Sequence, residues 1–222
     1  MTILGLERVS KRYGALVVAN EIDLVLEEGE ALGVIGPNGA GKTTLFNLIA
    51  GRMRIDSGSI TFQGLDITRL PAAERCRMGI SRSFQVPHPF TGMSVFENIL
   101  VGAAFGGHVS ERVAQGRAIE ALEITGLTHR ANAIAGSLTL LERKRLEMAR
   151  ALAADPRLLL LDEIAGGLTE HECHELVAAI RQIRETGVSI IWIEHIVHAL
   201  MAVVDRLVVI DFGLKISDGD PQ

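Results

Sequence analysis

The sequence has few cysteines and few aromatic residues for its 222-residue length. Cys76 and Cys173 lie far apart with no CxxC pattern, which favours the reduced thiols of a cytosolic protein over a disulfide. Seven Phe, one Trp and one Tyr cannot fill the core of a chain that is 48% apolar, so the core is expected to be aliphatic. The 23 glycines, by contrast, are a surplus that calls for a local explanation.

Long apolar runs are also missing. The most apolar stretches, residues 158–161 and 188–193, have the length of strands and end at charges, far short of the roughly 18 residues that span a bilayer. The first residues, MTILGLERVSKRYG, lack the basic segment and apolar core of a signal peptide. We therefore expect no membrane span and a protein that stays in the cytosol.

Basic residues are the minority among the charged side chains, 22 against 27 acidic ones, and the formal net charge is -5. The longest basic run is residues 143–145. Because wrapping a nucleic acid requires many contacts that neutralise phosphates, this balance argues against a nucleic-acid partner.

Strand and helix patterns alternate everywhere except in the middle of the chain. Between residues 94 and 154 the spacing is helical, with glycine breaks and no convincing strand. Elsewhere the patterns predict helices over 42–50, 170–184 and 196–203, and strands over 22–26, 31–35, 58–62, 65–67, 80–84, 157–161, 188–193 and 207–210. This alternation predicts an α/β fold with a mostly parallel sheet. We expect one domain over 1–222, in which a helical subdomain (86–154) interrupts a core (1–85 and 155–222).

A glycine-rich segment with the P-loop pattern GxxxxGK[ST] follows the predicted strand 31–35 and precedes a predicted helix. Its glycines let the backbone approach a phosphate chain, and the start of the helix turns its positive end toward the same anion. We expect Lys42 to reach the β- and γ-phosphates of a nucleoside triphosphate, Thr43 to hold Mg²⁺ and Thr44 to add a polar contact. The whole expected phosphate site is Gly36, Pro37, Asn38, Gly39, Ala40, Gly41, Lys42, Thr43 and Thr44.

Polar residues end two further apolar strands. Asp162 and Glu163 follow four leucines, at the strand end where ligands bind in open α/β sheets. We expect Asp162 to hold Mg²⁺ and Glu163 to orient or deprotonate an attacking water. His195 follows the strand 188–193 and could reach a γ-phosphate, although taken alone it is more readily an ordinary hydrogen-bonded polar residue.

The ordered set of motifs resembles the ATP-binding subunits of ABC transporters over nearly the whole chain. The set is Tyr13, the P-loop, Gln85, the segment 137–152, the Asp162–Glu163 pair and His195. The resemblance implies a P-loop NTPase core with an N-terminal antiparallel β-subdomain and an inserted helical subdomain. It implies that Tyr13 stacks on adenine, that Gln85 senses Mg²⁺ and the attacking water, and that Lys42, Glu163 and His195 are catalytic.

The chain departs from that family at the signature motif, LSGGQ. Here the sequence is Leu138-Thr139-Leu140-Leu141-Glu142, preceded by Ser137, so both glycines are leucines. In the family this motif contacts the γ-phosphate bound to the opposite subunit. Thr139 keeps the hydroxyl, and Thr139 with Glu142 forms a capping box that preserves the start of the helix. We therefore expect residues 137–142 to act on the partner's ATP.

Two smaller departures follow Glu163. Ile164 stands where the family usually has proline, and Thr169 stands where it usually has the aspartate of the segment that links the subunits. Communication between two ATP sites could differ as a result. Thr169 with Glu172 is also a capping box, so Thr169 is equally interpreted as a simple helix start.

Three segments, 79–85, 95–99 and 143–147, are most similar to the subunits of branched-chain amino-acid importers, whose relatives carry urea or other amides. The resemblance implies a head-to-tail partner ATPase, identical or different, separate permeases, an extracytoplasmic binding protein, and a place on the inner face of the membrane.

Residues 86–96, with Phe90, Met93 and Phe96, are expected to bind a permease helix or to be core under a loop. Two alternatives stay open: a regulatory cassette without a permease, and a P-loop kinase.

Overall fold

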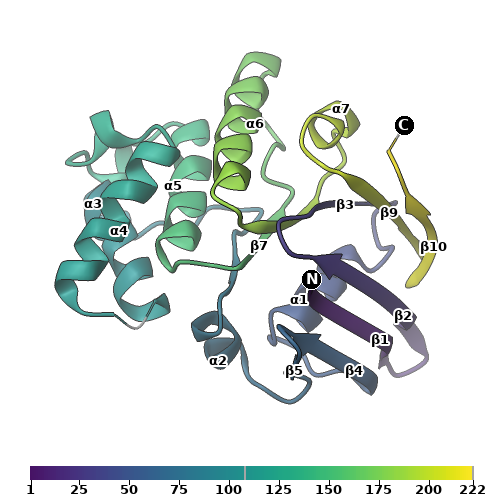
Figure 1. The fold of residues 1–222 in the computed structure, drawn as a ribbon. Helices are drawn as coiled ribbons and strands as arrows, with labels where there is room; N and C mark the ends of the chain where they lie inside the picture. Colours follow the sequence, from purple (N-terminus) through teal and green to yellow (C-terminus); the bar gives the residue numbers. More distant parts are fainter. Residues whose placement is uncertain (108, 222) are drawn as a thin grey trace.

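A computed structural model describes residues 1–107 and 109–221 of the chain. Two β-sheets and the helices around them form the fold (Figure 1). The larger sheet has the strand order β10-β9-β3-β8-β7-β6, and the smaller has the order β2-β1-β4-β5. The α/β fold and the antiparallel β-subdomain expected from the sequence are both confirmed.

The larger sheet is parallel from β9 to β6, and only β10 runs antiparallel to its neighbour. Every residue of β7 and β8 is buried, because helices cover both faces of the sheet. The carboxyl ends of β3, β8, β7 and β6 therefore meet at one edge. The strands are β3 (Ala31–Ile35), β6 (Ile80–Arg82), β7 (Leu158–Asp162), β8 (Ser189–Ile193), β9 (Arg206–Asp211) and β10 (Leu214–Gly219).

The smaller sheet is antiparallel throughout and consists of β1 (Thr2–Tyr13), β2 (Leu16–Glu27), β4 (Ser57–Phe62) and β5 (Leu65–Asp66). The hairpin expected around Gln63-Gly64 is present as β4 and β5. No strand was expected before residue 22, yet β1 has 12 residues and so does β2. Repeated register shifts between β1 and β2 break the period-two alternation, which explains why the pattern was missed.

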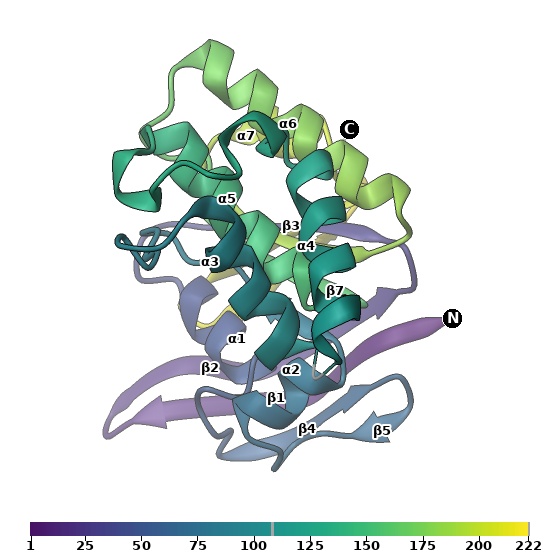
Figure 2. The same cartoon turned by 90° about the vertical axis from the view of Figure 1, so that its left-hand side faces the viewer.

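Helices occupy the segment 94–154 as expected, although residue 108 lies outside the described residues. They are α3 (Val95–Val101), a π-helical turn (Gly102–Gly106), α4 (Glu111–Ile124), two 3-10 turns (Thr128–Arg130 and Ala135–Ser137) and α5 (Leu140–Ala153). In Figure 2, α3, α4 and α5 lie beside one another and away from the antiparallel sheet. The remaining helices are α1 (Lys42–Ile49), α2 (Ala72–Arg77), α6 (Glu170–Glu185) and α7 (Val197–Met201).

Some boundaries differ from the sequence-based predictions. The strand expected over 80–84 ends at Arg82, and the helix expected over 196–203 is only the five residues of α7. Helix α2 and strand β10 were not predicted. Both are short, and β10 exposes or half-exposes every residue, so neither carries the apolar periodicity of a buried element.

The buried core is aliphatic and divides into three clusters. The first lies between the two sheets around α1, with Leu45 and Phe46 of that helix fully buried. The second packs α5 and α6 against the other face of the larger sheet, around the buried Trp192. The third holds α3, α4 and α5 to one another. Both sheets are thus anchored to α1, the helix that follows the P-loop.

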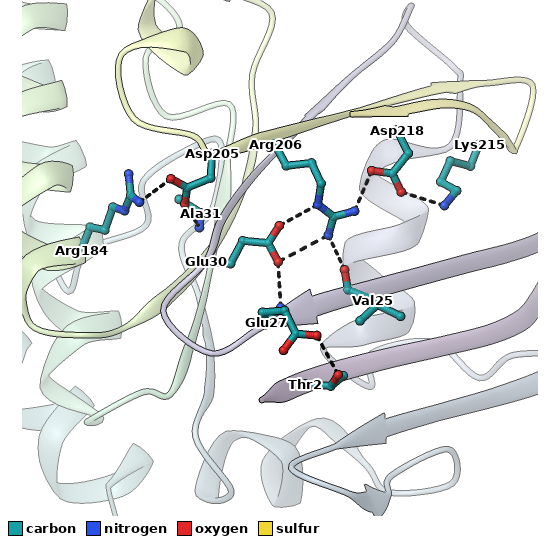
Figure 3. A network of polar contacts seen from close by, with 10 residues as sticks. All are labelled: Thr2, Val25, Glu27, Glu30, Ala31, Arg184, Asp205, Arg206, Lys215 and Asp218. Carbon is teal, nitrogen blue, oxygen red and sulfur yellow. Dashed lines mark hydrogen bonds and ion pairs between the residues drawn. The ribbon is translucent and has the colours of Figure 1, made fainter. Parts of the chain in front are cut away.

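A polar network joins the two sheets at the amino ends of β3 and β9 (Figure 3). Arg206 donates to the carboxylates of Glu30 (2.6 Å) and Asp218 (2.6 Å) and to the carbonyl of Val25. The Glu30 carboxylate also accepts from the Glu27 amide at 2.7 Å. The network therefore stands at the opposite edge of the larger sheet from the P-loop.

Candidate functional site

The P-loop connects β3 to α1, and its glycines are required by close backbone contacts. Gly36 and Gly41 have φ of 154° and 105°. A Cβ at Gly36 would lie 2.0 Å from the Ile210 carbonyl oxygen, and one at Gly41 would lie 2.4 Å from that of Val18. Only glycine fits at these two positions, because the backbones of β2 and β9 lie against the loop. Part of the glycine surplus is thereby explained.

Lys42, the first residue of α1, points back across the loop. Its ammonium donates to the carbonyls of Gly36 (2.7 Å) and Pro37 (3.0 Å), and the residue is only 6% exposed. Thr43 beside it is exposed, and Thr44 is half-buried. The free amide groups of the first turn of α1 and this ammonium are directed at the same place, which suits a phosphate chain.

Asp162 is the last residue of β7 and is buried in an ion pair that sequence reasoning missed. Arg82 of β6 donates to the Asp162 carboxylate at 2.6 Å and to the Asn47 side-chain oxygen at 2.7 Å. Its guanidinium lies 5.5 Å from the ring centre of Phe46 and 5.6 Å from that of Phe84. The only signal in the sequence was a charged residue within a predicted strand.

Glu163 leaves the strand in a left-handed backbone conformation, with φ of 46°. Its amide still donates to the Ile193 carbonyl of β8 at 2.8 Å, while its side chain turns to Gln85. The Gln85 amide donates to the Glu163 carboxylate at 2.6 Å. Residues 78 positions apart are thus brought together at the carboxyl ends of β6 and β7.

His195 follows β8 at the same edge and is exposed. Its Nδ1 lies 3.1 Å from the carboxylate of Glu194, which is fully buried. Glu194 also accepts from the amides of His195 and Ala165, both at 2.9 Å. Sequence reasoning gave Glu194 no role, although an acid that directly follows four apolar residues, 190–193, was a visible signal.

Tyr13 ends β1 and is 51% exposed. Its hydroxyl donates to the Met53 sulfur at 3.0 Å, and the Lys11 ammonium lies 5.8 Å from the ring centre. The paired strand β2 carries Val18, whose carbonyl faces Gly41 of the P-loop. The ring therefore stands on the hairpin that borders the phosphate loop, where an adenine platform would be needed.

The altered signature begins α5 as a capping box. Thr139 Oγ1 accepts from the Glu142 amide at 3.3 Å, and the Glu142 carboxylate accepts from the Thr139 amide at 2.8 Å. Leu138 and Leu141 are buried, whereas Ser137, Thr139 and Leu140 are exposed. The helix start thus forms without glycine, because Leu140 and Leu141 lie in its first turn, where φ is negative.

A groove of about 330 Å³ opens between the larger sheet and the helical segment. It has an apolar lining that includes Phe84, Val101, Phe105 and Ala151, with Arg52 and Arg82 at the side of the sheet. Phe90, Met93 and Phe96, expected to bind a permease helix or to be core under a loop, are not among the residues that line this groove. Phe96 packs on the helical core, and Phe90 lies 5.1 Å from the Arg150 guanidinium. The groove therefore lies beside the segment 86–96, not within it.

Within residues 1–107 and 109–221, no helix combines the length and apolarity that a membrane span requires. The longest, α6, has 16 residues and charged residues along its length.

Known proteins resemble this chain in sequence. Residues 19–166 match the family model described as ABC transporter. The chain is 37% identical to the high-affinity branched-chain amino acid transport ATP-binding protein BraF of Pseudomonas aeruginosa, over 99% of this chain and 92% of that protein. It is 35% identical, over the same shares, to the LivG protein of Escherichia coli, which bears the same description.

Solved structures agree in fold. A nucleotide-free ATP-binding cassette from an ABC transporter superposes with a TM-score of 0.92 at 29% identity, covering 100% of this chain and 92% of that one. A dimeric bacterial ABC transporter cassette superposes with a TM-score of 0.87 at 22% identity, covering 99% of both chains, and at that identity it shows the fold alone. The family model and the relatives, read with the P-loop and the acids at the sheet edge, lead to one conclusion: this chain belongs to the ABC transporter family, as an ATP-binding cassette that hydrolyses ATP to drive transport.

Proposed function

We propose that this chain is the ATP-hydrolysing subunit of a multi-subunit importer of branched-chain amino acids. The observation that carries the proposal is the gathering of the P-loop, His195, Glu163 and Gln85 at the carboxyl ends of four neighbouring strands, β3, β8, β7 and β6. The choice of solute is supported by the two relatives described as branched-chain amino acid transport proteins.

In the proposed mechanism, the P-loop holds the triphosphate and Lys42 exchanges its two carbonyl contacts for the β- and γ-phosphate oxygens. Glu163, fixed by Gln85, receives a proton from the attacking water or orients it, and His195 contacts the γ-phosphate. Tyr13 stacks on the adenine. Preorganised charge supplies most of the rate enhancement, since phosphoryl transfer needs little covalent help from the protein.

The residues proposed to hold Mg²⁺ fit that ion. Thr43, Gln85 and Asp162 offer a hydroxyl, an amide oxygen and a carboxylate, the hard oxygen donors that Mg²⁺ prefers beside phosphates. The Gln85 amide nitrogen is directed at Glu163, which leaves the amide oxygen for a cation. Bound there, Mg²⁺ would neutralise charge on the β- and γ-phosphates. Arg82 holds the Asp162 carboxylate in position.

A second cassette completes the proposed site. Residues 137–142 present the start of α5 with Thr139 exposed, so the motif is available to an ATP held by another subunit. The proposed arrangement is a head-to-tail pair; a bacterial cassette of the same fold is itself described as dimeric. The pair can be two copies of this chain or this chain with a different ATPase.

In the proposed transport role, this chain lies on the cytoplasmic face of the membrane against separate integral membrane permease subunits, with an extracytoplasmic binding protein on the other side. The apolar groove with Phe84 and Phe105 is the proposed seat of a permease helix. Its aromatic rim is exposed, Phe105 at 78%, and it adjoins Arg82, which contacts Asp162. Binding of a helix in the groove can thus affect the ATP site through Arg82 and Asp162.

Reconstitution tests the proposal. The chain would be combined in vesicles with the candidate permease, partner ATPase and binding protein found among its neighbouring genes. Uptake of labelled leucine, isoleucine and valine, with urea and acetamide as competitors, would then be measured with and without ATP. ATP-driven leucine uptake supports the proposal. Uptake of amides alone would replace the solute, and co-purification with only water-soluble partners would favour a regulatory cassette.

A further inference from the structure

Glu194 is the most deeply buried acid in the part of the chain that the structure describes, and its side chain stands between two loops of the site. It is fully buried, at 0% exposure. An ionised carboxylate in that position is costly unless donors surround it. The donors that contact Glu194 therefore indicate which parts of the site its carboxylate holds in place.

The two oxygens of Glu194 serve different loops. Oε2 accepts from the amide of Ala165, at 2.9 Å, in the loop that leaves β7 after Glu163. Oε1 accepts from the amide of His195 at 2.9 Å and from that of Ile196 at 3.4 Å, in the loop that leaves β8. It also lies 3.1 Å from His195 Nδ1. One carboxylate thus spans the Glu163 loop and the His195 loop.

A buried lysine supplies positive charge toward this carboxylate. Lys144 of α5 is 4% exposed, and burial lowers its pKa while the charge of Glu194 acts in the opposite direction. Lys144 lies on α5, the helix that Thr139 caps, so a buried positive charge of the signature helix acts on Glu194. Cys173 of α6 lies near the same charge, because Glu194 adds to the rise that burial causes in the pKa of its thiol.

We propose that Glu194 is a positioning residue for ATP hydrolysis. It clamps the backbones that carry Glu163 and His195 at a fixed separation and fixes the His195 ring through Nδ1, leaving Nε2 for the γ-phosphate. The inference rests on the proposed roles of Glu163 and His195.

The variant Glu194→Gln tests the clamp directly. A glutamine has one oxygen, so its amide nitrogen must face either the Ala165 amide or the His195 amide, donor against donor. Hydrogen exchange of these two amides, measured by NMR in the full chain, is expected to accelerate by at least about tenfold at one of them. Glu30→Gln is the matched control, because Glu30 also accepts a backbone amide and an arginine, but at the opposite edge of the sheet.

Kinetics distinguish positioning from mere stability. Glu194→Gln is expected to lower kcat by about 10- to 100-fold with KM for ATP within about twofold, whereas Glu30→Gln changes neither. Normal kcat in Glu194→Gln, or unchanged exchange at Ala165 and His195, overturns the proposal. Equal loss of kcat in both variants also overturns it, since the effect would then be general instability.

A second variant covers the case in which Glu194→Gln does not fold. Glu194→Asp keeps the charge but is one methylene shorter, so it can reach only one of the two loops. The same faster exchange and lower kcat are expected, and normal kcat or unchanged exchange at both amides would overturn the proposal. If the wild-type chain failed to hydrolyse ATP, the proposed residue roles would fail, while the exchange measurement would still decide whether the clamp exists.

Discussion

The backbone of Glu163 is strained, and the strained conformation sets the direction of its side chain. A left-handed conformation at a non-glycine residue costs about 1–3 kcal/mol. In return, the carboxylate leaves the line of β7 and meets Gln85 instead of packing against the sheet. Strain of this kind is typical of positions where a side chain acts on a substrate.

The change Glu163→Gln is expected to leave ATP binding intact and to lower hydrolysis by at least about 100-fold, because a glutamine cannot accept a proton from water. Equilibrium binding of a fluorescent ATP analogue and phosphate release would be measured on the same preparation. Exposed Glu111 of α4, changed to Gln, is the control. Turnover near that of the wild type would rule out the role assigned to Glu163.

Tyr13→Ala is expected to weaken ATP binding by about 1–3 kcal/mol, since it removes the aromatic face on which adenine would stack. Tyr13→Phe keeps the ring and loses only the hydroxyl contact with Met53, so its affinity should stay within about twofold of the wild type. Calorimetric titration with ATP measures both. If Tyr13→Phe were as weak as Tyr13→Ala, the hydroxyl and not stacking would matter.

At this scale, sequence reasoning located residues with a fixed place in a motif and missed their partners. Lys42 and Asp162 stand at or after the ends of strands in patterns that chemistry requires, and the role of His195 came from the family resemblance. Arg82 and Glu194 were missed because their importance depends on which strands become neighbours, β6 beside β7 and β7 beside β8. Strand order is a property of the packed sheet and leaves no local pattern.

Helix starts are the best-determined feature at the scale of elements. Three helices, α3, α5 and α6, begin with a complete capping box, at Ser94, Thr139 and Thr169. The boxes at Thr139 and Thr169 were predicted from four-residue patterns. A cap requires only neighbours along the chain, so it can be predicted without knowledge of the tertiary fold. Strand β1 is the opposite case, because its register depends on two other strands.

The caps of α3 and α5 provide a matched pair of variants. Thr139→Ala and Ser94→Ala each remove a hydroxyl that accepts from the third helical amide, so each should lower the free energy of unfolding by about 1 kcal/mol. Only Thr139→Ala is expected to lower ATP turnover of the assembled transporter as well. Urea unfolding and phosphate release measure the two effects. Equal turnover in both variants would mean that the altered signature no longer acts on ATP.

The capping carboxylates also predict a response to acid. Backbone amides of Ser94 and Thr169 lower the pKa of Glu97 and Glu172 below the ordinary value of 4.5. A lowered pKa means that the folded state binds the proton less well than the unfolded state, so the caps stabilise above pH 4.5 and lose this effect as the pH falls through the lowered pKa.

A double variant, Glu97→Gln with Glu172→Gln, is expected to lose less stability than the wild type as the pH falls below 4.5, because glutamine does not titrate. Urea midpoints at several pH values in that range test this. Parallel curves for the two proteins would show that other groups dominate acid unfolding.

For the whole molecule, the Arg206 network fastens the antiparallel sheet to the larger sheet (Figure 3). Arg206→Met leaves the Glu30 and Asp218 carboxylates without their shared cation and is expected to cost about 2 kcal/mol of stability. Because the network lies at the edge opposite the P-loop, kcat should not change. Exposed Arg112→Met is the control in the urea titration. A large loss of kcat at full stability would contradict a purely structural network.

The contacts that shape the P-loop have a consequence for evolution and for engineering. The carbonyls of Val18 in β2 and Ile210 in β9 lie against Gly41 and Gly36, and Lys42 bonds to the loop itself. A loop preformed in this way surrenders little conformational entropy when it takes up phosphates. Its affinity is then set partly by strands that never touch a nucleotide, so substitutions in β2 or β9 can tune ATP binding while every motif residue stays unchanged.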